Sequence, residues 1–246
     1  MQNTIENNNF ARPIKKDNNV EIDRENVKND TRGVQEMGFI RRENRIIEEA
    51  KTILKGRDGG ANQAKQQGCD GSQFDADTKG QETDVEAWAK VNSLWRDDAT
   101  EWLEERYGKK IGSGAESFVF CHDGHTVIKV RDITGYNNLL EALESIEIHN
   151  KLFPETAMKV LGFGRSDDEF AIVFTQSFVE GEHPTNEEIE TYVYLKFGAV
   201  KDEGVIGGTS YKTDEYLLQD LKPQNVIISN GRFFVIDGDF YYTRKC

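Results

Sequence analysis

Apolar residues are unevenly distributed along this chain of 246 residues. Residues 1 to about 32 are rich in Asn, Asp, Glu and Lys, and residues 57–82 are rich in Gly, Gln and Asp. Such segments bury too little apolar surface to offset the chain entropy lost on folding. We therefore predict that residues 1–82 are largely disordered and dispensable for ligand binding, with one possible helix near residues 40–55. Its apolar positions are Ile40, Ile46, Ile47 and Ile53.

The apolar density rises sharply from about residue 83, where we expect the folded domain to begin. Helical spacing of aromatic and aliphatic residues predicts two helices in DVEAWAKVNSLWRDDATEWLEERYG. Two β-like runs follow, SFVFCH and HTVIKV, and the Asp-Gly pair between them predicts a hairpin. A helix from Tyr136 to Leu152 and two further strands, AMKVLGFG and FAIVFTQSF, complete the pattern. This order predicts an α+β fold with one helix packed on an antiparallel sheet.

Composition and charge exclude several classes of function. The net charge of −13 argues against a general nucleic-acid or anionic-membrane partner, because those partners attract basic surfaces. Cys69, Cys121 and Cys246 are odd in number and lack metal-ligand spacing, which favours a reducing cytoplasm. No apolar run is long enough to span a bilayer. We expect a cytoplasmic protein with no nucleic-acid or membrane partner.

The densest group of candidate catalytic residues lies in LLQDLKPQNVIISNGRFFVIDGDF, residues 217–240. Two apolar strands flank an Asn-Gly pair, which predicts a type I′ hairpin that returns Asp237 beside Asn225. A carboxylate and an amide oxygen are hard ligands of the kind that Mg²⁺ prefers. Asp220 could accept a proton from a hydroxyl, and Lys222 could offer positive charge to a phosphate. The pattern favours phosphoryl transfer.

These residues resemble the motifs of the protein kinase family. The catalytic loop H-R-D-L-K-P-x-N aligns with residues 218–225, with Gln219 in the position of the Arg. The metal-binding D-F-G aligns with Asp237, although Asp239 is a competing choice. The Gly-rich loop aligns with GSGAESFV, in which Ser117 replaces the third Gly, and the strand Lys of V-A-I-K aligns with Lys129. The matching loop residues are Gly112, Gly114 and Val119.

The resemblance implies further site residues on the helix and on the last strand of the sheet. A helix glutamate should pair with Lys129, and counting back from Pro154 favours Glu144, with Glu147 and Glu141 as alternatives. Thr175 would be the gatekeeper beside the nucleotide. Backbone groups of the hinge from Gln176 to Phe178 would bind adenine.

More narrowly, SIEIHNKLFPET, GFG and the stop soon after VIDGDF are similar to kinase domains of bacterial polyvalent proteins, which belong to mobile elements. This resemblance covers roughly residues 84–246 and implies a serine/threonine/tyrosine kinase. Seven residues follow Asp239, so an activation loop and the helices that dock protein substrates are missing from the pattern. We expect a minimal, truncated kinase-like domain over residues 83–246, with an antiparallel N-lobe sheet, one helix and a reduced C-lobe.

The resemblance implies an ATP- and Mg²⁺-dependent phosphotransferase of the Ser/Thr type. Asp220, Lys222, Lys129 and Glu144 would be catalytic, and Asn225 and Asp237 would bind the metal. A protein substrate or an activating partner would be supplied in trans. A small-molecule kinase and a pseudokinase that serves as a nucleotide-binding interaction module are alternative functions. Retention of Lys129, Asp220, Asn225 and Asp237 together argues against the pseudokinase.

Overall fold

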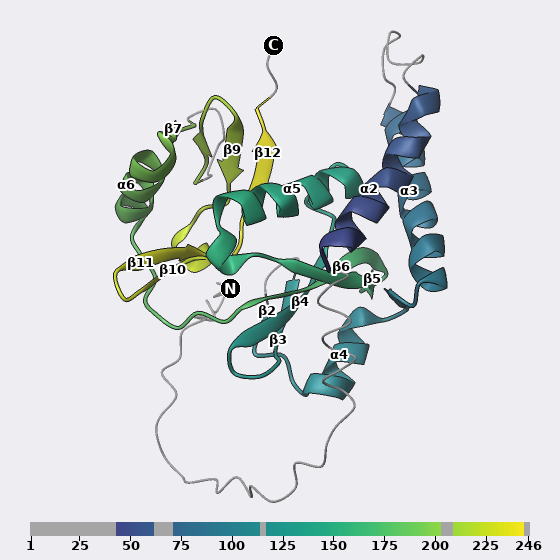
Figure 1. Ribbon diagram of the computed structural model, residues 1–246, viewed down its shortest axis with the longest axis horizontal. Helices are drawn as coiled ribbons and strands as arrows, with labels where there is room; N and C mark the ends of the chain where they lie inside the picture. The colour runs from purple at the N-terminus through teal and green to yellow at the C-terminus, as the bar shows by residue number, and fades with distance from the viewer. Residues whose placement is uncertain (1–42, 62–70, 114–116, 203–208, 244–246) are drawn as a thin grey trace, which may run out of the picture. The chain divides into compact units, whose positions relative to one another are not determined.

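The computed structural model describes residues 43–61, 71–113, 117–202 and 209–243. Its largest element is a six-stranded sheet with the order β1-β5-β6-β4-β3-β2 (Figure 1). All neighbouring strands are antiparallel except β1, which runs parallel to β5. The predicted antiparallel sheet is therefore present, with one parallel strand added at its edge. The strands are β1 (Trp95–Arg96), β2 (Gly112–Ser113), β3 (Ser117–Cys121), β4 (Thr126–Asp132), β5 (Lys159–Ser166) and β6 (Glu169–Ser177).

Local signals in the sequence account for the turns of this sheet. Asp123 accepts hydrogen bonds from the amides of His125 and Thr126, and Gly124 has a φ of 80°, which closes the predicted β3–β4 hairpin. Asp167 and Asp168, with φ values of 51° and 68°, form the β5–β6 turn. Positive φ at both central residues matches the right-handed twist of the strands.

Two helices cover opposite faces of the sheet. The helix α5 (Leu139–Leu152) begins after Asn138, whose side chain accepts from the Glu141 amide, and it packs beside β12 (Asp239–Tyr242). The helix α4 (Ala99–Tyr107) is capped in the same way by Asp98 and packs on the other face. The helix predicted to start at Tyr136 therefore starts three residues later, at Leu139, directly after its capping residue.

Order begins earlier than the sequence suggests. The helices α2 (Glu43–Ala61) and α3 (Gly71–Val91) run side by side (Figure 1), although a linker was expected over residues 57–82. Apolar residues of α2 join the core formed with α5 and β5, and Lys51 forms an ion pair with Glu147 of α5. The buried residues of α2 include Ile46, Ile47, Ala50 and Leu54. Composition could not reveal this order because α2 gains its burial only from distant partners.

Residues 1–42 and 62–70 lie outside the described part of the chain, so the disorder predicted for them stays a prediction. The packing of α2 nevertheless changes the expectation that everything before residue 83 is dispensable. Removal of α2 would expose the apolar core on which α5 rests. We therefore expect truncation to residue 83 to destabilise the domain.

The C-terminal part of the chain forms smaller units. A four-stranded antiparallel sheet has the order β12-β9-β8-β7, and a separate hairpin pairs β10 with β11. Asn230 and Gly231, both at positive φ, form the predicted turn of that hairpin. The helix α6 (Asn186–Phe197) begins with a capping box between Thr185 and Glu188, a motif readable in the sequence. The strands are β7 (Val200–Lys201), β8 (Tyr211–Lys212), β9 (Tyr216–Gln219), β10 (Val226–Ser229) and β11 (Arg232–Val235), and short 3₁₀ turns are η1 (Pro154–Thr156) and η2 (Pro223–Asn225).

Candidate functional site

One face of the six-stranded sheet gathers the candidate residues of β2, β3 and β4. Val119 of β3 pairs directly with Lys129 of β4, and Gly112 of β2 pairs with Val119. Because side chains alternate between the faces of a strand, Lys129 and Arg131 share one face and Ile128 lies on the other. The structure thus brings Gly112, Val119 and Lys129 together. Gly114 lies outside the described residues.

Lys129 is buried and points at the segment that follows β11. Lys129 is only 7% exposed, and its Nζ donates to the carbonyl of Ile236 at 2.8 Å. Burial lowers the pKa of Lys129 below its usual value, and the nearby Asp237 carboxylate opposes that shift. A hydrogen bond thus links the strand lysine to the residue that precedes Asp237.

The helix α5 does not supply the expected glutamate. Within the described residues, Lys129 forms no ion pair with Glu144 or with either alternative. Glu147 is paired with Lys51, and Glu141 accepts from the backbone and side chain of Asn137. The buried side chain of α5 that contacts β12 is Ser145, whose Oγ accepts from the Phe240 amide at 2.9 Å.

The register of β6 against β4 places Thr175 and Gln176 on different faces of the sheet. Ile128 pairs with Thr175 and Val127 pairs with Gln176, so Gln176 shares the Lys129 face whereas Thr175 lies on the opposite face. Gln176 is buried, and its Nε2 donates to the carbonyl of Thr156 at 2.7 Å. The structure therefore brings Gln176, and not Thr175, to the Lys129 face.

The backbone groups within the predicted hinge, Gln176 to Phe178, face different sides. The amide of Phe178 donates to the carbonyl of His125 at 2.8 Å and is already paired. Backbone groups of neighbouring strand residues point to opposite sides, so Ser177 directs its N–H and C=O away from β4. The pairing of β6 with β5 stops at Thr175. Ser177 is thus better placed than Phe178 to offer backbone groups to a ligand.

The catalytic-loop residues are held together by short local contacts. Asp220 has a φ of 56°, and its Oδ1 lies 3.0 Å from the Nζ of Lys222. The Nδ2 of Asn225 donates to both the carbonyl and the Oδ2 of Asp220, each at 2.8 Å. The carbonyl of Asn225 in turn accepts from the Ile236 amide at 2.9 Å. This last bond places the Asp237 segment beside the loop, as the hairpin motif predicts.

Asp237 and Asp239 occupy different surroundings although they are two residues apart. The Oδ1 of Asp237 accepts from the Gly238 amide at 3.0 Å and lies 3.4 Å from Nη1 of Arg131. Burial favours a raised pKa for Asp237, but Arg131 and Lys129 outweigh it and lower the pKa. Asp239 begins β12 and pairs with Gln219 in the strand register. Gly238, with a φ of 149°, permits the sharp turn between them.

The donor atoms suit a hard cation. Because Asn225 turns its amide nitrogen toward Asp220, its Oδ1 remains for a metal ion, and Asp237 adds an ionised carboxylate. Mg²⁺ characteristically takes one or two such protein ligands and completes its shell with water and substrate phosphates. The described residues contain no cluster of three His, Cys, Asp or Glu side chains that could hold a metal without such help.

Comparison with known families gives a match. Residues 78–244 match the model of the serine/threonine/tyrosine kinase found in polyvalent proteins. The chain belongs to this family. Membership indicates phosphotransferase activity in general and implies ATP with a divalent metal as the usual partners of the polyvalent-protein kinases. No curated protein and no solved structure matches the chain at a significant level.

None of the helices in the described ranges is both long enough and apolar enough to cross a bilayer.

Three residues of the site were missed by the sequence reasoning. Arg131 follows Lys129 by two positions and therefore shares its face, a signal that strand alternation could have provided. Tyr136 and Ser145 had no such signal, because each reaches Asp239 or its neighbour only through the packing of α5 on β12.

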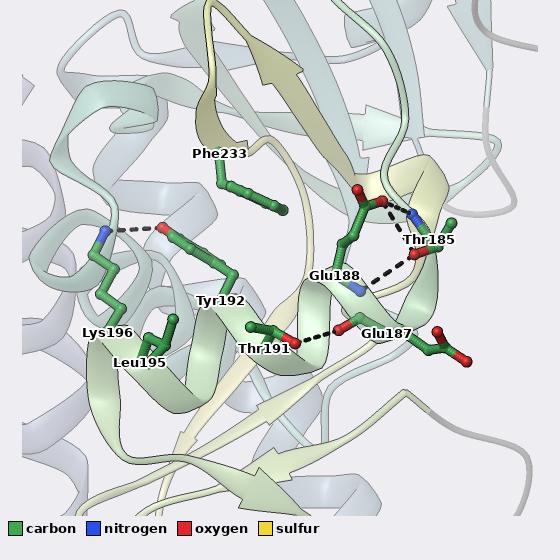
Figure 2. Close-up of a pocket in the computed structure, with 8 residues that line it drawn as sticks. All are labelled: Thr185, Glu187, Glu188, Thr191, Tyr192, Leu195, Lys196 and Phe233. Carbon is green, nitrogen blue, oxygen red and sulfur yellow. Dashed lines mark hydrogen bonds between the residues drawn. The ribbon is translucent and has the colours of Figure 1, made fainter.

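A separate hollow of about 720 Å³ lies on α6 and is drawn in Figure 2. Two of its lining residues, Tyr192 and Phe233, stack on each other with ring centroids 4.6 Å apart. Several of its polar side chains bond to other lining residues, as Lys196 does to the Tyr192 hydroxyl at 3.0 Å. No candidate site residue lines this hollow, and the motif residues around Lys129 and Asp237 offer the reactive groups. The lining is Thr185, Glu187, Glu188, Thr191, Tyr192, Leu195, Lys196 and Phe233.

Proposed function

We propose that this polyvalent-protein kinase transfers the γ-phosphoryl group of ATP to a hydroxyl of a protein substrate, with Mg²⁺. The observation that supports the proposal is the convergence of Lys129, Asp220, Asn225 and Asp237. A chain of short contacts joins them: Asn225 bonds to Asp220 and to Ile236, and Ile236 bonds to Lys129. These groups come from a strand, a loop and a hairpin that are distant in sequence.

The side chains of the loop have distinct roles in this proposal. Asp220 orients the attacking hydroxyl and accepts its proton as the new oxygen–phosphorus bond forms and the bond to the β-phosphate bridging oxygen breaks. Lys222, half exposed beside Asp220, directs positive charge to the transferred group. Asn225 and Asp237 would hold Mg²⁺, which offsets negative charge on the phosphates.

The sheet positions the nucleotide in this proposal. Lys129 would exchange its bond to the Ile236 carbonyl for the α- and β-phosphates. Val119 and Val127 would pack against the base, and Gln176 would take the gatekeeper position. Ser177 would offer hinge backbone groups to adenine.

One observation favours a second candidate, a nucleotide-binding module without transfer. Arg131 lies on the Asp237 carboxylate, and a cation there competes with a metal ion for the same oxygen atoms. Binding of ATP without Mg²⁺-dependent transfer would support that candidate.

Phosphate transfer from radiolabelled ATP by the purified full chain, alone and with bacterial lysate, tests the proposal. We expect Asp220→Asn to reduce the rate by roughly 10²-fold or more while nucleotide binding persists, because a positioned base is lost. Lys129→Met should reduce both binding and rate. Lys212→Met, which removes a half-exposed lysine of β8, is the matched control and should leave both unchanged. Equal rates for Asp220→Asn and the unmodified chain would refute the catalytic assignment.

A further inference from the structure

Arg131 is the most enclosed charged group at the candidate site besides Lys129. Its side chain is 11% exposed and extends from β4 to the turn between β11 and β12. Nη2 lies 2.5 Å from Oδ1 of Asp239, and Nη1 lies 3.4 Å from Oδ1 of Asp237 and 3.5 Å from the Gly238 carbonyl. One guanidinium therefore contacts all three residues of the Asp237–Asp239 turn.

Asp239 is held by a second donor from a different element. The hydroxyl of Tyr136 donates to Oδ1 of Asp239 at 2.7 Å, and the Arg131 guanidinium lies over the Tyr136 ring at 5.2 Å. Tyr136 precedes α5, and its hydroxyl is also 3.3 Å from Oγ of Ser145. Ser145 accepts from the Phe240 amide. Neutral hydroxyl groups of Tyr136 and Ser145 thus make the contacts to β12.

The charges of this cluster balance without a helix glutamate. Lys129 and Arg131 supply two positive charges, and Asp237 and Asp239 supply two negative charges. Burial alone would lower the pKa of Arg131, but Asp237, Tyr136 and Asp239 raise it above its usual value, so the guanidinium stays charged. Within the described residues, no glutamate of α5 enters the cluster.

The geometry also separates the two aspartates. Asp239 is fixed in the β12 ladder opposite Gln219, and its Oδ1 is occupied by two donors. Asp237 has two donors on its Oδ1 as well, but it directly follows Ile236, whose amide donates to the carbonyl of Asn225. Asp237 is therefore the aspartate whose backbone neighbour is bonded directly to the Asn225 loop.

We propose that Arg131 is a positioning residue for Asp237 as a metal ligand, and that Asp239 is the anion that anchors Arg131. The proposal rests on the proposed function and deepens it. The guanidinium fork is rigid enough to fix the turn through two aspartates at once, which a single ammonium group could not do. It also assigns the metal to Asp237 and leaves Asp239 outside the coordination shell.

Mg²⁺ titration of fluorescent ATP binding by the full chain tests this assignment. Arg131→Met should raise the Mg²⁺ concentration at half-saturation by roughly 10- to 100-fold, the usual cost of losing a residue that orients a metal ligand. Nucleotide affinity in EDTA should stay the same. Arg131→Lys should recover part of the loss. Asp237→Asn should abolish the Mg²⁺ response, whereas Asp239→Asn should only weaken it.

Arg165→Met is the matched control, because Arg165 lies on β5 of the same sheet and is paired with Glu82 and Glu86. It should lower the melting temperature without changing the Mg²⁺ response. If Arg131→Met does not fold, Tyr136→Phe removes one donor to Asp239 and should raise the Mg²⁺ requirement by a smaller factor.

The outcomes separate this proposal from the proposed function. An unchanged Mg²⁺ response in Arg131→Met or Tyr136→Phe overturns the positioning role while kinase activity can stand. A response lost in Asp239→Asn but kept in Asp237→Asn moves the metal to Asp239 and also overturns it. A raised Mg²⁺ requirement in a chain that transfers no phosphate supports positioning and removes catalysis. Absence of any Mg²⁺ response in the unmodified chain overturns both.

Discussion

The two parts of the molecule hold their functional groups in different ways. The sheet region, β1–β6 with α2–α5, buries Lys129, and this residue is 7% exposed. The C-terminal region, α6 with β7–β12, holds Asp220 and Lys222 on a loop where their side chains are 44% and 46% exposed. Burial fixes the first group, and local hydrogen bonds fix the second. Substitutions should therefore affect stability mainly in the sheet region and activity mainly in the loop.

The helix α5 belongs to both regions. Its first half packs in the core of the sheet region through Leu139 and Leu143. Its last turn contributes Ile148 to the core of the C-terminal region, together with Phe240 of β12. A change in the packing of α5 should thus reach the Asp237 turn, which immediately precedes β12.

The largest expected effect on stability is in α2, for which the sequence analysis gave only a possible helix near residues 40–55. Leu54 of α2 is fully buried in the core of the sheet region. Leu54→Ala should reduce the free energy of unfolding by about 2–5 kcal/mol, because it removes buried methyl groups and leaves a cavity. Urea denaturation measures the change.

Leu195→Ala on α6 is the matched control, since Leu195 is 76% exposed. It should change the free energy of unfolding by less than about 0.5 kcal/mol. A similar loss in the two variants would mean that α2 does not belong to the core and that residues before 83 are dispensable after all.

Elements defined by local chemistry were predictable from the sequence. The Asn230-Gly231 hairpin and the capping box of α6 depend on residues within four positions of one another, and both are present. The burial of α2 was not predictable, because its apolar residues gain their partners from β5 and α5 about a hundred positions away.

The candidate site divides along the same line. The contacts among Asp220, Lys222 and Asn225 follow from their spacing in one loop. The face on which Thr175 lies depends on the register of β6 against β4, which no local signal specifies. The glutamate partner was sought by counting along α5, whereas the anions that face Lys129 and Arg131 come from the turn before β12. The catalytic and ligand roles of all these residues stay predictions.

The second largest effect on stability is expected from His149, which lies on α5 where the two regions meet. Burial lowers the pKa of His149 to about 4, although its Nε2 lies 2.9 Å from the carbonyl of Thr156. The folded chain keeps this imidazole neutral, while the unfolded chain protonates it below about pH 6.5. The stability that the fold gains by keeping His149 neutral is fully present above pH 6.5 and is lost as the pH falls toward 4. Over this range the contribution amounts to about 3 kcal/mol.

Urea denaturation of the unmodified chain and His149→Gln from pH 7 to 4.5 measures that contribution. The difference in unfolding free energy between the two proteins should shrink as the pH falls, because Gln keeps an amide for Thr156 but does not titrate. Parallel curves would show that His149 is not held neutral and that the two regions are less tightly joined at α5 than the burial indicates.

The smallest effect is expected at an exposed ion pair that also links the two regions. Arg232 of β11 lies 3.2 Å from Glu155 of η1, and the two side chains are 65% and 41% exposed. Water screens such a pair, and ordering two long side chains costs entropy, so Arg232→Ala should reduce the free energy of unfolding by less than about 1 kcal/mol. Raising the salt concentration should remove most of that difference. A loss of unfolding free energy as large as that of Leu54→Ala would show that the C-terminal region depends on this ion pair. Burial of apolar side chains would then not be what separates the sheet region from the C-terminal region.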